Sequence, residues 1–244
     1  HGPGSALFQE LAKFTRDYTY FKEDFLGTTA AEAIGASKVF VYAESAMGPV
    51  DPVKTTPTAN LTSYISWEGG ATDPSSSNIA TQAIFCAKWN PFCEVRFQED
   101  ETYANNTVEM FYGFVAALPA SAGAILGDID TPTFAGGVTD AAGYGVDTDE
   151  TLKTGALVTI GTSTTVGATT IPTALAAPYT QPTLNVDVTY RVELRCPTPD
   201  SSVSRAFLFI NNVLVAERAG PDAEIAMVNT FWHGNRGADV MYKL

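Results

Sequence analysis

Positive charge is scarce in this sequence, and it is nowhere concentrated. The 244 residues include 14 Lys and Arg against 27 Asp and Glu, which gives a formal net charge of −13. A nucleic-acid backbone and an anionic membrane surface both select proteins with clustered Lys and Arg. We therefore expect neither nucleic acid nor a membrane among the partners of this protein.

Histidine and cysteine are also rare, with two His and three Cys in the chain. This supply does not provide a zinc ligand set, so we expect no transition metal. The odd number of cysteines argues against a secreted disulfide framework. Cys86 and Cys93 are close enough in sequence for a local disulfide, but we favour buried free thiols because a small apolar thiol suits a β-sandwich core.

Long apolar runs are missing as well, since no stretch approaches the roughly 20 residues that a membrane-spanning helix needs. Residues 1–5 lack the basic and apolar regions of a signal peptide. They read as a tag remnant or a natural flexible start. We expect an arm over residues 1–20 and one domain over residues 21–244.

Within the arm, residues 5–16 have the pattern of a short helix that Ser5 can cap. A helix of this length is not stable alone and must pack on the domain or on a neighbouring subunit. The apolar residues that would form this assembly contact are Leu7, Phe8, Leu11 and Phe14.

The rest of the chain has the alternation typical of β-strands. Apolar and polar side chains alternate over residues 93–98 and 190–195, which predicts two strands with one buried face each. Residues 107–116 are apolar on both sides apart from Glu109, which predicts a central strand. In the segment 206–217, two apolar runs flank Asn211-Asn212, a pair that tolerates the positive φ of a tight hairpin turn. Further strands are expected at 38–43, 61–66, 80–86, 143–147, 156–160 and 239–244.

Three segments, 45–60, 118–141 and 161–183, are rich in Pro, Thr, Ala and Gly, and we read them as long surface loops. Strands of the same pattern resume after each of them. The predicted fold is therefore all-β: a single antiparallel β-sandwich, or jelly roll, with a short N-terminal helical arm.

Six stretches carry a family resemblance. Residues 21–27 (FKEDFLG) resemble an F-x-D-D-F-x-G opening, and residues 93–97 (CEVRF) an E-x-R strand. Residues 110–116 (MFYGFVA) resemble F-x-G-F-x-D, and residues 140–149 (DAAGYGVDTD) resemble D-x-x-G-F-x-x-D-T-D. Residues 190–194 (YRVEL) and 207–215 (FLFINNVLV) resemble Y-x-L-R-I-E and F-Y-I-N-G-x-L-V, with Asn212 in place of Gly. In this order they resemble the concanavalin A-like sandwich proteins of tailed bacteriophages.

This resemblance implies a virion structural protein without enzymatic activity. Such a protein decorates or stabilises the capsid, or belongs to the tail, and docks on other virion subunits through its arm and loops. It would lie on the virion surface after assembly in the host cytoplasm. A decoration protein at capsid three-fold positions would be a homotrimer.

Two alternatives remain open, a lectin-like carbohydrate-binding module for host or surface attachment and a glycoside hydrolase. Trp67, Trp89 and Trp232 could stack on sugar rings, or they could fill the core or a subunit contact. His233 is read as a loop or interface residue near Trp232.

Catalysis receives little support from the sequence. The paired-carboxylate motifs E-x-D-x-x-E and E-x-D-x-E of retaining glycosidases do not occur, and the acidic clusters at 99–101 and 147–150 are read as solvated strand ends. A hydrolase would instead have to use Glu94, Glu109 and Glu193. We expect no catalytic residues and no required cofactor.

Calcium is the one cofactor that the acidic residues leave open. Its candidate oxygen ligands are Asp128, Asp130, Asp147 and Asp149.

Overall fold

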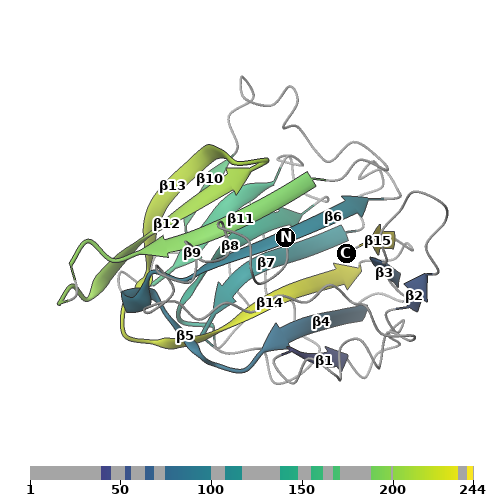
Figure 1. The fold of residues 1–244 in the computed structure, drawn as a ribbon, viewed down its shortest axis with the longest axis horizontal. Coiled ribbons are helices and arrows are strands. Elements are labelled where there is room, and N and C mark those ends of the chain that lie inside the picture. The colour runs from purple at the N-terminus through teal and green to yellow at the C-terminus, as the bar shows by residue number, and fades with distance from the viewer. Residues whose placement is uncertain are drawn as a thin grey trace, which may run out of the picture.

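The computed structural model describes residues 40–44, 53–55, 64–68, 75–99, 108–116, 138–147, 155–161, 167–170, 188–198, 200–235 and 241–243. These residues form two antiparallel sheets that lie one over the other (Figure 1). The predicted antiparallel β-sandwich is therefore confirmed. The N-terminal helical arm, with Leu7, Phe8, Leu11 and Phe14, lies outside the described residues.

The first sheet follows the order β1-β4-β14-β7-β8-β9-β10, and a short strand β5 pairs with β14 at its start. Its strands are β1 (Phe40–Glu44), β4 (Ser75–Thr81), β5 (Phe85–Cys86), β7 (Val108–Val115), β8 (Ala141–Asp147), β9 (Ala156–Ile160), β10 (Gly167–Thr170) and β14 (Ala226–Asn235).

The second sheet follows the order β13-β12-β11-β6-β15-β3-β2. Its strands are β2 (Val53–Thr55), β3 (Tyr64–Glu68), β6 (Phe92–Glu99), β11 (Val188–Arg195), β12 (Val203–Ile210), β13 (Val213–Asp222) and β15 (Met241–Lys243). Strands distant in sequence therefore become neighbours, as β6 and β11 do through the pairs Val95–Tyr190 and Cys93–Val192.

The core lies between the two sheets, as the alternation predicts. Tyr190, Val192 and Leu194 of β11 are buried, whereas the residues between them are half-buried. Tyr190 stacks on Tyr144 of the facing sheet, with 4.4 Å between the ring centroids. Because burying one such side chain contributes about 1.5–3 kcal/mol, this alternation fixes which face of β11 points inward.

Strand β7 is buried on both faces, which confirms its predicted central place. Met110, Tyr112 and Phe114 belong to the core between the sheets. Phe111 and Val115 belong to a second cluster on the opposite face, together with Trp232.

The predicted hairpin is also confirmed. Strands β12 and β13 pair across Asn211 and Asn212, which have φ of 48° and 67°. Two successive residues with positive φ give the turn the twist of its flanking strands, and Asn tolerates this conformation at low cost.

The main difference from the sequence-based expectation is β14. Our interpretation of His233 as a loop residue is wrong, because it lies within this ten-residue strand, which pairs with both β4 and β7. The polar residues of β14 hide the strand pattern. One of them, Asn229, is buried and its Nδ2 donates to the Gly113 carbonyl over 2.9 Å, so its polarity is satisfied inside the sandwich.

Smaller differences lie in the segments expected to be loops. Strand β2 lies within 45–60, and β10 lies within 161–183. The strand expected at 80–86 is divided into β4 and β5, which are separated by residues 82–84. Among the described residues, no helix is long and apolar enough to cross a membrane.

Candidate functional site

A polar cluster inside the sandwich is a first candidate for chemistry, and its burial argues against that role. Cys93, Tyr112 and Asn229 meet between the sheets, and all three are buried. Burial raises the pKa of the Cys93 thiol to about 12, and it raises the pKa of Tyr112 well above its usual value. A thiol held protonated away from solvent is a structural residue and not a nucleophile.

The three cysteines are free, as favoured from the sequence, with Cys86 and Cys93 buried and Cys196 partly exposed. Cys196 follows β11 in the second sheet, whereas His233 lies in β14 of the first sheet. The fold therefore places the backbone of Cys196 at the end of a strand of one sheet and that of His233 in the other sheet.

The outward face of β6, β11 and β12 carries the most concentrated functional chemistry among the described residues. Four of the seven arginines of the chain point outward here, at neighbouring positions of the three strands. We call this surface the arginine face. Its members are Phe92, Glu94, Arg96, Arg191, Glu193, Arg195, Arg205, Phe207 and Phe209, with Glu217 of β13 at its edge.

Salt bridges and aromatic rings hold Arg191 and Arg195 in place. The Nε atom of Arg191 lies 2.9 Å from a Glu193 oxygen, and the other oxygen of Glu193 accepts from Arg195 over 3.0 Å. The guanidinium of Arg191 lies over the ring of Phe209, 4.4 Å from its centroid. The guanidinium of Arg195 lies over Phe207 at 4.6 Å. Such stacking holds a planar guanidinium in a defined orientation.

An aromatic segment borders the arginine face at the end of β11. It begins with the 3-10 helix η2 (Ala87–Trp89) and continues through Asn90 and Pro91 into β6. The Trp89 side chain is 69% exposed and that of Phe92 is 50% exposed. Large apolar groups with this much exposure are candidates for ligand contact.

Several hydrogen bonds fix this segment. The Oδ1 atom of Asn90 accepts from the Cys196 backbone N–H over 2.6 Å, and the Pro91 carbonyl accepts from Leu194 N–H over 2.9 Å. Asn90 adopts φ of 51°, a left-handed conformation that Asn tolerates and that ends η2.

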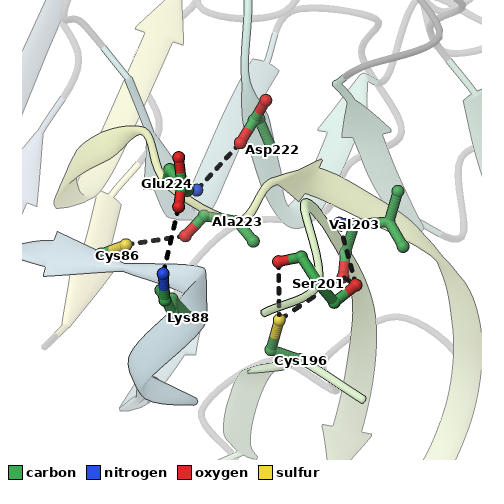
Figure 2. Close-up of polar contacts among 8 residues, drawn as sticks. All are labelled: Cys86, Lys88, Cys196, Ser201, Val203, Asp222, Ala223 and Glu224. Carbon is green, nitrogen blue, oxygen red and sulfur yellow. Dashed lines mark hydrogen bonds and ion pairs between the residues drawn. The ribbon is translucent and has the colours of Figure 1, made fainter. Parts of the chain in front are cut away.

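The other side of η2 is tied to the turn after β13 (Figure 2). The Cys86 thiol donates to the Ala223 carbonyl over 2.7 Å, and the Lys88 Nζ atom lies 3.1 Å from Glu224. The hydrogen bond to Glu224 raises the pKa of the Lys88 ammonium. Trp89 is therefore presented from a backbone that is anchored on both sides.

A shallow depression connects the aromatic segment to the arginine face. Its volume is about 360 Å³, and it is open to solvent. The lining residues are Asn90, Phe92, Glu193, Leu194, Arg195 and Cys196. It therefore combines an exposed ring with a carboxylate and a guanidinium, the two kinds of group that orient a polar ligand.

The structure separates the candidate contacts predicted from the sequence. Trp89 is 69% exposed and directly precedes Asn90, which lines the depression. Trp232 is only 2% exposed and packs in the second cluster, so its ring cannot meet a ligand at the surface. Trp67 lies in β3 and His233 in β14, and their side chains are outside the described residues.

Of the four Asp residues predicted as calcium ligands, only one lies in the described part of the chain. Asp147 ends β8, and Asp128, Asp130 and Asp149 lie outside the described residues. Within the described part of the chain, no group of three His, Cys, Asp or Glu side chains is placed to hold a metal ion.

Sequence reasoning missed Phe92, Arg195 and Arg205 as site residues. Phe92 carried a usable signal, since it is an aromatic residue in phase with the outward Glu94 and Arg96. Arg195 and Arg205 are adjacent because of the register between β11 and β12, and the sequences of the two strands do not show that register.

Comparison with known proteins supports the fold and leaves the function open. No model of a known protein family matches the sequence, and no curated protein does. The potassium-bound carbohydrate recognition domain of Emp46p is similar in structure, with a TM-score of 0.56, 7% identity, and coverage of 92% of this chain and 93% of that chain. A protein of unknown function from Shewanella oneidensis MR-1 is similar with a TM-score of 0.55 and 11% identity, and the match covers 100% of this chain and 96% of that chain. The alginate lyase vAL-1 from Chlorella virus is similar with a TM-score of 0.50 and 5% identity, and the match covers 90% of this chain and 96% of that chain.

These similarities correct one prediction. Our expectation that the chain is not an enzyme is contradicted by the presence of a polysaccharide lyase among proteins with this architecture. At 5% identity the likeness shows the fold alone, so it assigns no activity. The potassium-bound form of the Emp46p domain is likewise a property of that protein. What the comparisons establish is the architecture: this chain has the concanavalin A-like β-sandwich fold that is shared by lectin domains and polysaccharide lyases.

Proposed function

We propose that this protein binds a carbohydrate at the depression lined by Phe92 and Arg195, with Trp89, which precedes the lining residue Asn90, as a further contact. The observation that carries this proposal is the exposure of two aromatic side chains, 69% for Trp89 and 50% for Phe92, on a backbone segment fixed by hydrogen bonds. An aromatic face offers a flat apolar surface to the C–H groups of a sugar ring. The carbohydrate recognition domain of Emp46p has the same fold, which makes a glycan a reasonable first ligand class.

The depression supplies the polar half of such a contact. Glu193 can accept hydrogen bonds from hydroxyl groups, and Arg195 can donate to ring or hydroxyl oxygens. Because both lie in β11 beside the exposed ring of Phe92, a sugar could stack on the ring and hydrogen-bond at its edge. A site built on strands and anchored turns also loses little conformational entropy when the ligand binds.

Affinity electrophoresis in gels that contain single polysaccharides tests the proposal. We expect at least one polysaccharide to retard the wild-type protein, and Trp89→Ala and Phe92→Ala to weaken that retardation about tenfold or more. Leu214→Ala is the matched control, because Leu214 is also an exposed apolar residue, 45% exposed, but lies at the hairpin end of the arginine face's strands. Equal effects of all three substitutions would contradict the assignment of the site.

A virion structural role, for capsid decoration or tail attachment, is the second candidate. The family resemblance of residues 21–244 motivates it, and exposed apolar residues around η2 favour it, because Ile84, Val203 and Ile225 could pack against another virion subunit. Light scattering on the full chain and on a chain lacking residues 1–20 tests this role. A trimer that dissociates on truncation would support it, and a monomer in both cases would contradict it.

A further inference from the structure

The arginine face contains one arrangement that the sandwich itself does not require. Arg195 of β11 and Arg205 of β12 are direct register partners, so their side chains leave adjacent strands toward the same side. Two like charges at directly opposed positions destabilise an antiparallel pair. Both side chains are 55% exposed.

The glutamates nearby compensate only part of this charge. Glu193 accepts from Arg195 but also lies 2.9 Å from Arg191, so one carboxylate serves two guanidinium groups. Glu217 lies 2.6 Å from the Arg205 Nε atom. Across the arginine face, four arginines stand against Glu94, Glu193 and Glu217, so this surface has a positive balance in a chain of net charge −13.

Donors remain available in this pair. Arg195 uses Nε and one Nη atom for Glu193, and Arg205 uses Nε for Glu217. Within the described part of the chain, the other Nη atom of Arg195 and both Nη atoms of Arg205 have no protein acceptor. Their guanidinium groups can therefore still bind an anion through several N–H groups.

We infer that the ligand is an acidic polysaccharide and that its carboxylate or sulfate groups bind between Arg195 and Arg205. This inference rests on the proposed function, since it specifies the ligand of the same site. Arg195 lines the depression that Phe92 also lines, so an acidic sugar can stack on the ring while its anionic group reaches the arginine pair. The anion relieves the repulsion between the opposed arginines, which a neutral sugar cannot do.

Matched polymers test the charge requirement directly. Polygalacturonate presents carboxylates, and carboxyl-reduced polygalacturonate presents the corresponding neutral chain. A sulfated carrageenan separates sulfate from carboxylate as the preferred group. We expect the acidic polymers to bind at least about tenfold more tightly than the reduced polymer, and this advantage to shrink as salt is raised from low to physiological ionic strength.

Substitutions then locate the anion site, with trigalacturonate as the ligand in titration calorimetry. We expect Arg195→Gln and Arg205→Gln each to weaken binding about tenfold. Arg96→Gln is the control: it removes the same charge from the same face, and it lies opposite Thr189, six residues along β11 from Arg195. At about 3.3 Å per residue this is roughly 20 Å away. The affinity of Arg96→Gln for trigalacturonate bound at the arginine pair should therefore fall by less than about twofold.

The outcomes separate the inference from the proposed function. Equal binding of native and carboxyl-reduced polymer would overturn the acidic-ligand inference and leave glycan binding intact. Failure to bind any polysaccharide would overturn the proposed function itself. Binding of poly-glutamate as tight as that of polygalacturonate would assign the arginine pair to acidic proteins instead. The polymer comparison uses the unaltered protein, so it decides the matter even if a variant fails to fold.

Discussion

The buried thiol of Cys93 should make the free energy of unfolding of the sandwich fall as the pH rises above 9. Its pKa rises from an ordinary value of 9.0 to about 12 in the folded protein, chiefly because burial disfavours the thiolate. An unfolded chain loses this proton above pH 9, whereas the folded chain retains it. The contribution of Cys93 is therefore fully present below pH 9 and is lost as the pH rises toward 12.

The size of the effect follows from this shift. Three pKa units correspond to about 4 kcal/mol at the upper limit, and about 2 kcal/mol of that is lost by pH 10.5. Urea unfolding of the wild type and of Cys93→Ala at pH 7.5 and pH 10.5 measures it. We expect the wild type to lose about 2 kcal/mol more free energy of unfolding than the variant over this interval.

The double difference removes the main confounding contributions. The cavity that Cys93→Ala creates is independent of pH, so it cancels between the two conditions. Tyr112 is present in both proteins, and burial, the largest cause of its raised pKa, acts in both, although Cys93 adds to that rise in the wild type. An equal loss of stability in the wild type and the variant would refute the assignment of Cys93 as a buried neutral thiol.

The fold also predicts the effects of three local changes. Gly113→Ala should lower the free energy of unfolding by at least about 2 kcal/mol and the Tm by about 4–8 °C, because an added Cβ would lie 2.3 Å from the Ala142 carbonyl oxygen; an unchanged Tm would contradict the close approach of β7 and β8. Asn212→Gly should leave the free energy of unfolding within about 0.5 kcal/mol of the wild type, although Arg191 loses its 3.1 Å hydrogen bond to Asn212. Asn212→Val should lower it by about 1–2 kcal/mol, because a β-branched residue is strained at the positive φ of 67°. Urea unfolding of both variants would measure these differences. In the native protein Ellman's reagent should modify only the partly exposed Cys196 rapidly, and rapid reaction of a second thiol would contradict the burial of the other two.

Local pattern was enough where a strand has one buried face. The alternation in β6 and β11 follows directly from packing on the core. The expected strand at 156–160 also coincides with β9, which is buried on both faces. The hairpin was predictable because Asn211-Asn212 can adopt the required φ angles without help from the rest of the fold.

Pattern was insufficient where long-range contacts satisfy polar groups or decide exposure. Asn229 interrupts the apolar run of β14, and its burial is explained by long-range contacts such as the hydrogen bond to Gly113 of β7. Neither Trp89 nor Trp232 shows its exposure in the local sequence, yet one is exposed and the other is buried in the second cluster. The opposition of Arg195 and Arg205 depends on the register of β11 and β12, so no local pattern indicates it.

Tryptophan fluorescence can show whether a polysaccharide binds beside Trp89. Trp89 is 69% exposed, so acrylamide should quench it efficiently, whereas the buried Trp232 should be shielded. Polygalacturonate should protect the wild-type protein from quenching, and this protection should disappear in Trp89→Phe. Binding of the polymer that leaves wild-type quenching unchanged would place the glycan elsewhere on the sandwich and contradict a site beside Trp89.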